Sequence, residues 1–161
     1  MQNYRVIPKK KNNPKKEITM GTQQILLIVL SVIIVGVAIA VGISMFNSQA
    51  YNANKTAIAS DAQAYAAQVL QYWKTPESQG GAGGVADNMT VDAVTAYLGL
   101  TSPNNTNENG TYTVTSANGT TVVITGLGKA NRNDMNPQIV TSITLATDTV
   151  TAVASDEAVG T

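Results

Sequence analysis

The side chains that most often carry out chemistry in proteins are few in this chain and widely spaced. The sequence contains no cysteine and no histidine, which excludes disulfides, thiolate zinc sites and every mechanism that needs a thiolate or an imidazole. Carboxylates can form acid–base pairs or bind a hard cation, yet the only two neighbouring acids are Asp156 and Glu157, near a C-terminus that we expect to fray. The sequence therefore predicts that the chain is not an enzyme and carries no cofactor.

Two polar motifs suggest binding or modification. The segment from Asn131 to Pro137 offers oxygen ligands for Ca²⁺ but lacks the spaced carboxylates of a calcium loop, so it predicts a turn and no metal site. The pattern Asn-X-Thr is an acceptor for N-glycosylation where the host has the machinery. A chain this rich in Asn and Thr would also contain several such patterns by chance. They occur at Asn54, Asn88, Asn104, Asn109 and Asn118.

Four aromatic residues recur at helical spacing in the first half of the chain: Tyr51, Tyr65, Tyr72 and Trp73. Such a row could stack on a ligand or pass electrons. Aromatic side chains at helical spacing are, however, more often part of a core. We therefore expect these four rings to pack against another layer of the fold.

An uninterrupted apolar segment from Ile25 to Phe46 must be accommodated before any of these residues is positioned. It carries no charge, and about 20 apolar residues in a helix span the hydrocarbon core of a bilayer, which is longer than the apolar part of a typical signal peptide. Six of the ten basic residues precede Gly21, with one acid, whereas four bases and nine acids follow it. The positive-inside rule places the N-terminus in the cytoplasm and the rest outside, and the acidic outer part gives no support to nucleic-acid binding.

The helical period continues beyond the apolar segment. Residues 22–46 are predicted to form an apolar transmembrane helix, and residues 47–74 its amphipathic continuation, because the sequence from Gln49 to Trp73 contains neither Pro nor Gly. The expected apolar face is Ala50, Ala53, Ala57, Ile58, Tyr65, Val69, Tyr72 and Trp73. Pro76 and the glycine-rich residues 79–84 then predict a helix end and a flexible loop.

Residues 75–161 are expected to form a globular head. A short helix is predicted over 88–98, with Asp87 or Asn88 as its cap, and Asn118-Gly119 marks a β-hairpin. Four strands are expected near 111–116, 120–126, 139–145 and 149–153. No alternation is evident in the third strand. The predicted fold class is α+β: a long N-terminal helix packed on a C-terminal four-stranded antiparallel sheet, which only the amphipathic helix is large enough to cover.

Small residues are spread through the apolar segment where close helix packing would need them, namely Ser31, Gly36, Ala38, Ala40, Gly42 and Ser44. Small side chains let neighbouring apolar helices approach closely in a membrane oligomer or a filament core. The same residues are common in any membrane helix. Packing positions at Ser31, Gly36, Ala40 and Gly42 are therefore one interpretation, and lipid-facing filler is the other.

A basic leader that ends in Gly, an apolar helix that turns amphipathic and a small antiparallel sheet together resemble the type IV pilins and their relatives, the pseudopilins of type II secretion and competence systems. In that family a prepilin peptidase cuts after the Gly, the new amino terminus is N-methylated, and the apolar helix becomes the filament core. The matching residues are Gly21, at the cleavage site, and Thr22, the residue to be methylated. The resemblance implies a leader over residues 1–21.

The resemblance also implies partners and a location. The partners would be the prepilin peptidase, the pilus assembly machinery, identical subunits in a helical filament, and the inner membrane before assembly. The precursor would cross the cytoplasmic membrane once, with its N-terminus inside, and the mature protein would be extracellular.

One position departs from the family pattern. Filament-forming members usually carry a Glu close to the mature N-terminus, where it pairs with a neighbouring subunit's amino group. Leu26 stands at the matching position, and Gln23 and Gln24 are the nearest polar residues. Three functions therefore stay open: a pilin of an extracellular filament, a pseudopilin of a secretion or competence apparatus, and an uncleaved, signal-anchored surface protein.

Overall fold

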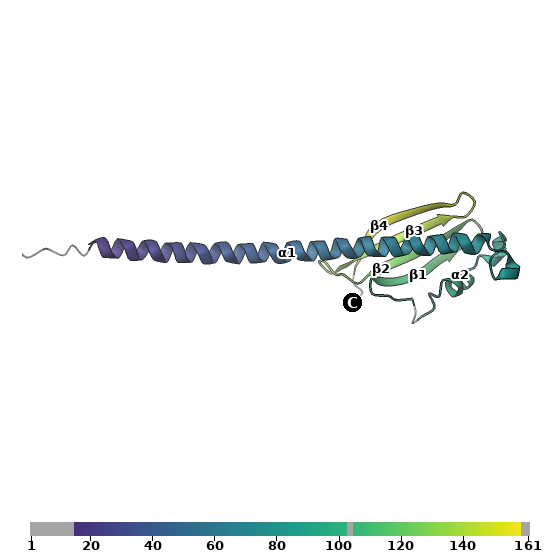
Figure 1. Ribbon diagram of the computed structural model, residues 1–161, viewed down its shortest axis with the longest axis horizontal. Coiled ribbons are helices and arrows are strands. Elements are labelled where there is room, and N and C mark those ends of the chain that lie inside the picture. Colours follow the sequence, from purple (N-terminus) through teal and green to yellow (C-terminus); the bar gives the residue numbers. More distant parts are fainter. Residues whose placement is uncertain (1–14, 103–104, 159–161) are drawn as a thin grey trace, which may run out of the picture. The chain divides into compact units, whose positions relative to one another are not determined.

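The computed structural model describes residues 15–102 and 105–158, with side chains from residue 21 onward. Most of the expected leader, residues 1–14, and the acceptor Asn104 lie outside the described residues. The elements follow in the order α1, two short 3₁₀ helices, α2 and four strands (Figure 1). The chain divides into two compact units, of which the first ends at Ser44 and the second begins at Met45. The predicted α+β class is confirmed.

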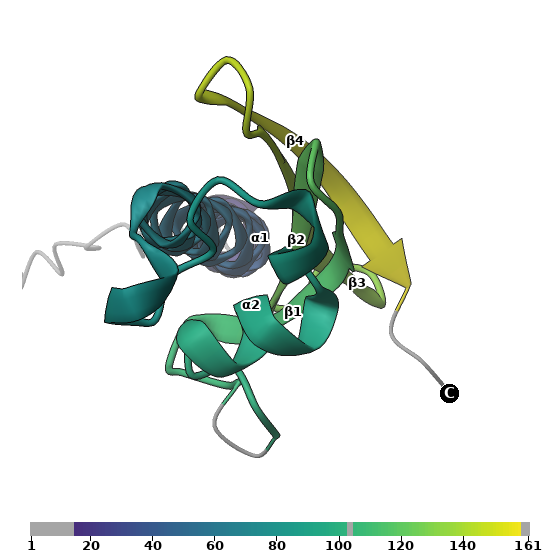
Figure 2. The same ribbon diagram turned by 90° about the vertical axis from the view of Figure 1, so that its right-hand side faces the viewer.

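Helix α1 (Lys15–Lys74) runs without a break from the apolar segment into the amphipathic one. Nothing in its sequence forces it to end earlier, since its glycines, Gly21, Gly36 and Gly42, are isolated and no proline occurs until Pro76. Its second half belongs to the unit that begins at Met45, where it lies across one face of the sheet (Figure 2). One helix therefore serves both segments.

The face of α1 that packs on the sheet begins with Tyr51 and Ile58, which are seven residues apart and therefore lie on the same side of the helix. Ala50 and Ala53, which were expected on this face, are instead exposed, because at about 100° per residue both point well away from the Tyr51 direction. Tyr65 and Trp73 are partly buried against the core. The buried residues of α1 are Tyr51, Ile58, Ala62, Ala66, Val69 and Tyr72, which confirms the helical spacing but adds two alanines to it.

The glycine-rich segment after α1 caps the helix. The backbone N–H groups of Ala82, Gly83 and Gly84 donate to the carbonyls of Tyr72, Thr75 and Trp73, each at 2.9 Å. These carbonyls belong to the last turn and have no partner within a helix. Ala82 is fully buried. The expectation of a flexible loop is therefore corrected: the segment folds back onto the end of α1, and its glycines permit the backbone to do so.

Helix α2 (Val91–Tyr97) is shorter than the predicted helix over 88–98 and starts from a different cap. Its N-cap is Thr90, whose hydroxyl accepts from the backbone N–H of Ala93 at 3.2 Å. Asn88 is the last residue of a 3₁₀ helix, η2 (Ala86–Asn88), and its side chain bonds elsewhere. The helix ends before Gly99, which adopts a left-handed conformation with φ of 69°.

The sheet is a meander of four antiparallel strands in the order β1-β2-β3-β4. Strand β1 (Gly110–Ala117) and β2 (Thr121–Gly128) form the hairpin predicted at Asn118-Gly119, with a bulge between Val114 and Ser116. The turn is held by the Asn118 side chain, and Gly119 is required by space because a Cβ there would overlap Ala86. The hairpin therefore needs glycine for close packing.

Strands β3 (Met135–Thr144) and β4 (Thr149–Ala158) are both longer than predicted. Asn133 and Asp134 adopt left-handed conformations in a tight turn closed by the Arg132–Met135 pair, so β3 begins four residues early. Pro137 is tolerated because pairing to β2 stops at Gln138. The C-terminal residues expected to fray instead pair with β3 as far as Ala158.

Buried and less buried residues do alternate along β3, but the sequence does not show it. The polar residue Thr141 lies in the core, and the apolar residue Val140 lies on the opposite face. The buried face comprises Pro137, Ile139, Thr141 and Ile143. Thr141 is fully buried, and its hydroxyl has no hydrogen-bond partner among the residues that the structure describes. A buried hydroxyl without a partner lowers stability.

Replacing this hydroxyl by a methyl group is expected to stabilise the protein. Thr141→Val keeps the shape and removes the unpaired polar group, so the free energy of unfolding should rise by about 1 kcal/mol. Denaturation of the full chain in detergent, followed by the fluorescence of Trp73, measures this. The matched control, Thr113→Val at an exposed position of β1, should change stability little. A destabilised Thr141→Val protein would show that the hydroxyl has a partner.

Candidate functional site

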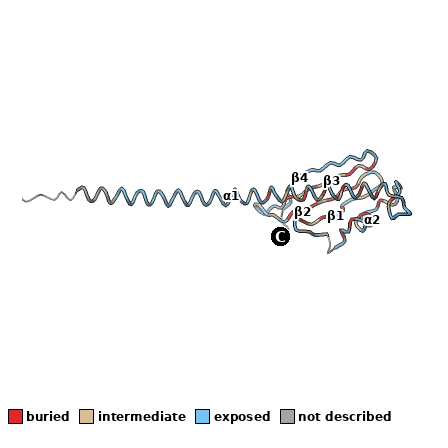
Figure 3. The backbone as a smooth tube through the Cα atoms, in the orientation of Figure 1, coloured by how far each residue is buried: buried red, intermediate tan, exposed pale blue. Residues whose placement is uncertain are grey.

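The most distinctive surface of the described chain is the apolar part of α1. Its large side chains are all exposed, from 50% at Val29 to 70% at Phe46 (Figure 3). By length and composition, α1 is the one described helix suited to cross a membrane, although a signal sequence near the N-terminus would pass the same test. Apolar surface on this scale is strongly unfavourable in water, at roughly 25 cal/mol per Å². Cover by lipid or by other apolar helices would therefore be favourable.

The expected processing residues, Gly21 and Thr22, both lie within α1. A Cβ at Gly21 would meet no atom within 4 Å, so glycine is not required there by packing inside the chain. The side chains of Leu26 and its neighbours are exposed along the same helix.

The four expected packing residues do not share one face of α1. At 3.6 residues per turn, Gly36 and Ala40 lie one above the other, whereas Ser31 and Gly42 lie together on a different side. A Cβ at Gly36 or Gly42 would meet no atom within 4 Å, and the Ser31 hydroxyl donates to the Leu27 carbonyl at 2.7 Å. The four small residues therefore lie on two different sides of α1, and neither glycine is required by contacts within the described chain.

A partly buried carboxylate network lies where α1 meets the loop before β1. The Oδ2 atom of Asp61 accepts hydrogen bonds from the Tyr112 hydroxyl at 2.6 Å and from the side-chain amides of Asn109 at 2.8 Å and Asn107 at 2.9 Å. The rings of Tyr65 and Tyr112 lie 5.0 Å apart. Three donors on one oxygen fix the loop to the helix.

The electrostatics of this network follow from its hydrogen bonds. Burial raises the pKa of Asp61, but the bonds from Asn109, Tyr112 and Asn107 together outweigh it, and the pKa is lowered below its usual range. Burial and the bond to Asp61 raise the pKa of Tyr112 well above its usual value. The pair holds its proton firmly on the phenol, which suits a structural hydrogen bond rather than proton transfer.

A second polar cluster surrounds Tyr51, which is 2% exposed. Its hydroxyl donates to Asp156 Oδ1 at 2.6 Å, Lys55 Nζ lies 3.1 Å from the same oxygen, and the Arg132 guanidinium lies 4.5 Å from the centre of the ring. Burial and the bond to Asp156 raise the pKa of Tyr51 to about 12. The bonds from Tyr51 and Lys55 lower the pKa of Asp156. This cluster joins α1, the turn before β3 and the end of β4.

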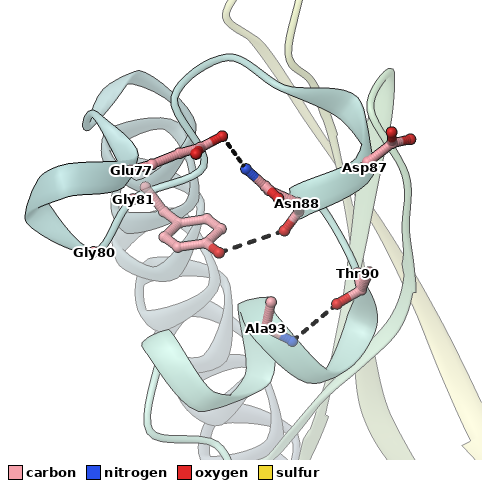
Figure 4. Close-up of a pocket in the computed structure, with 8 residues that line it drawn as sticks. Glu77, Gly80, Gly81, Asp87, Asn88, Thr90 and Ala93 are labelled. Carbon is pink, nitrogen blue, oxygen red and sulfur yellow. Dashed lines mark hydrogen bonds between the residues drawn. The ribbon is translucent and has the colours of Figure 1, made fainter.

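An open hollow of about 450 Å³ lies between the end of α1 and the start of α2 (Figure 4). Several of its polar groups form hydrogen bonds: the Asn88 amide donates to Glu77 at 2.6 Å, the Tyr72 hydroxyl donates to the Asn88 carbonyl at 3.4 Å, and Thr90 caps α2. The described residues include no group of three or more acids, histidines or cysteines close enough to hold a metal ion. The hollow therefore lies between elements that these hydrogen bonds connect.

The acceptor sequences are placed very differently. The side-chain amides of Asn54, Asn88 and Asn109 are partly buried and donate hydrogen bonds within the protein. Asn118 is exposed in the turn between β1 and β2. The predicted turn over Asn131–Pro137 leads into β3, as the structure shows from Arg132 onward.

Sequence reasoning did not identify Asp61 or the Tyr51 cluster. Asp61 is the single acid between Gly21 and Lys74, three residues after Ile58 and four before Tyr65. An isolated acid on the packing face of a helix is a usable signal. Comparison of the chain with models of protein families, with curated proteins and with solved structures finds no match.

The Asp61 network should make stability depend on pH. A carboxylate whose folded pKa is below its unfolded value stabilises the protein above the unfolded pKa, and this is lost as pH falls through the folded pKa. Asp61→Asn should lower the free energy of unfolding by about 2 kcal/mol at pH 7, because charge-assisted bonds are lost, and should flatten the decline below about pH 4.

Denaturation followed by Trp73 fluorescence between pH 2 and 7 measures both effects. The control is Asp87→Asn, at an exposed position on η2. Equal pH profiles for the two variants would contradict the assigned role of Asp61.

Proposed function

We propose that this protein is a structural subunit of an extracellular type IV pilus-like filament. A prepilin peptidase removes residues 1–21, the apolar part of α1 packs with its copies in the filament core, and the head forms the outer surface. The observation that carries the proposal is the exposed, uncharged helical surface from Ile25 to Phe46. It continues in the same helix that packs on the sheet.

The contrast between covered and uncovered apolar surface supports this proposal. The head buries its own core, from Ile58 and Val69 of α1 to Ile124 and Ile143 of the sheet. The apolar part of α1 has no such cover from the described chain. A surface that is suited first to lipid and then to neighbouring apolar helices fits a subunit that leaves a membrane for a helical assembly.

Leu26 favours a second candidate, an uncleaved signal-anchored surface protein. A filament subunit of the usual kind would carry a carboxylate here, and a charge pair buried in an apolar environment fixes register as well as orientation. Leu26 offers only apolar contact. In our proposal, subunits are aligned by shape, through the small residues of α1, in place of the charge pair.

Processing at Gly21 is the first expected outcome. Protein isolated from its native host should begin at Thr22 and carry one added methyl group on the terminal nitrogen, as intact-mass and N-terminal peptide mass spectrometry will show. A chain that begins at Met1 or Gln2 would favour the signal-anchored protein. A processed chain found only in short envelope-bound assemblies by electron microscopy would indicate a pseudopilin.

Assembly should depend on the small residues of α1. Gly36→Leu and Gly42→Leu cause no overlap within the chain and raise helix propensity, so the membrane-bound precursor should accumulate normally. Filaments recovered by shearing should fall roughly tenfold, which corresponds to about 1.4 kcal/mol of lost association free energy. Quantitative immunoblots of membrane and sheared fractions measure both.

The matched control is Val37→Leu, which keeps an exposed aliphatic side chain on the same helix. It should assemble normally. Unchanged filament yield in both glycine variants would contradict packing through these positions, and an equal loss in Val37→Leu would show that any added bulk is harmful.

A further inference from the structure

Five Asn-X-Thr sequences have no role in the proposed filament. An N-linked sugar replaces one hydrogen of the Asn Nδ2 atom, and the finished glycoprotein must accommodate the sugar whether it is added before or after folding. The nitrogen must therefore face solvent in the folded protein. The structure describes four of the five sites, and their hydrogen bonds distinguish them.

Asn88 and Asn109 use this nitrogen inside the fold. The Nδ2 atom of Asn88 donates both to Glu77 Oε1 at 2.6 Å and to the Ala82 carbonyl at 3.1 Å, so both of its hydrogens are occupied. The Nδ2 atom of Asn109 donates at 2.8 Å to Asp61, in the carboxylate network. A sugar on Asn88 would displace one of its two bonds, and a sugar on Asn109 would have to fit beside the partly buried bond to Asp61.

Asn54 is held on both sides of its amide. Its Nδ2 atom donates to the Asn109 carbonyl at 2.8 Å, and its Oδ1 atom accepts from the backbone N–H of Ala130 at 3.1 Å. The neighbouring Gly128 approaches so closely that a Cβ there would overlap the Asn54 side chain. The Asn54 amide is thus fixed in a partly buried position by bonds at both its nitrogen and its oxygen, which disfavours the addition of a sugar.

Asn118 is presented in the opposite way. It is exposed in the turn between β1 and β2, and Thr120, the hydroxyl residue of its sequence, is exposed as well. Its Oδ1 atom accepts from the backbone N–H groups of Thr120 at 2.9 Å and Thr121 at 2.7 Å. These bonds turn the oxygen toward the backbone and direct the nitrogen away from it.

We propose that Asn118 is an acceptor for N-linked glycosylation and that Asn54, Asn88 and Asn109 are not. The Nδ2 atom attacks C1 of an oligosaccharide carried on a lipid diphosphate. The bond from C1 to the phosphate oxygen breaks, the new C1–N bond forms, the amide nitrogen loses one proton, and the lipid diphosphate leaves. The inference rests on the proposed function only in that the head must be outside the cytoplasm, where such transfer occurs.

Mass spectrometry of the full-length protein from its native host tests the proposal. A protease that cuts after Glu releases residues 109–157, a peptide that contains only the Asn109 and Asn118 sequences. Electron-transfer fragmentation then assigns the sugar to one of them. We expect a glycan mass on Asn118 and unmodified Asn54, Asn88 and Asn109.

Four variants separate chemistry from folding. Thr120→Ala should abolish the glycan mass on the peptide of residues 109–157, and Thr120→Ser should retain it, because only the hydroxyl is required. Asn118→Asp removes the nitrogen but keeps the oxygen that holds the turn, so loss of the glycan there cannot come from a broken hairpin. Thr56→Ala removes the Asn-X-Thr acceptor pattern at Asn54 and should leave the glycan mass on Asn118 unchanged.

An unmodified Asn118, or a glycan on Asn54, Asn88 or Asn109, would overturn the inference. The same spectra report the N-terminus of the protein. A chain that begins at Thr22 with no glycan would therefore overturn this inference and leave the filament proposal standing, and a glycosylated chain that begins at Met1 or Gln2 would do the reverse.

Discussion

The fold of the head depends on the contact between α1 and one face of a four-stranded sheet. A single antiparallel sheet of this size needs a cover to be stable, and α1 supplies it with a face that combines small and large side chains. Ala62 and Ala66 are fully buried beside Ile58 and Val69. Alanine at these positions lets the helix backbone approach the sheet closely, so that the larger side chains of β2 and β3 fill the space between the layers.

Two polar clusters complete this contact, each at a place where the layers alone would leave an edge open. Asp61 gathers three donors from the loop before β1 and from β1 itself. Tyr51 gathers Asp156 from β4 and Arg132 from the turn before β3. Both clusters join residues far apart in sequence to the same helix, and both keep their carboxylates hydrogen-bonded, which is the condition under which partly buried charges are tolerated.

The sequence was sufficient for the fold class, for α1 as one helix and for the β1–β2 hairpin, because periodicity and turn residues are local signals. It was insufficient where tertiary contacts decide. The N-cap of α2 is Thr90 and not the predicted Asp87 or Asn88, because the Asn88 side chain bonds to Glu77 and Ala82. The core face of β3 was obscured by Thr141, a polar residue in an apolar position. Strand β4 extends through Asp156 because Tyr51 and Lys55, a hundred residues earlier, bind its carboxylate.

The two parts of α1 differ in how much of their apolar surface the protein itself covers. This difference bears on the kind of function that the chain can perform. In the head, the apolar groups form a core, and Glu77, Asn88 and Tyr72, which line the hollow beside α2, are joined by hydrogen bonds. From Ile25 to Phe46 the same helix offers apolar side chains on every side, with small residues on two of its faces. A surface that is apolar all round can be covered by lipid or by other apolar helices. In the proposed filament, small residues on two sides of α1 would let each helix meet neighbours on both of these sides, whereas a pair of helices would use only one of them.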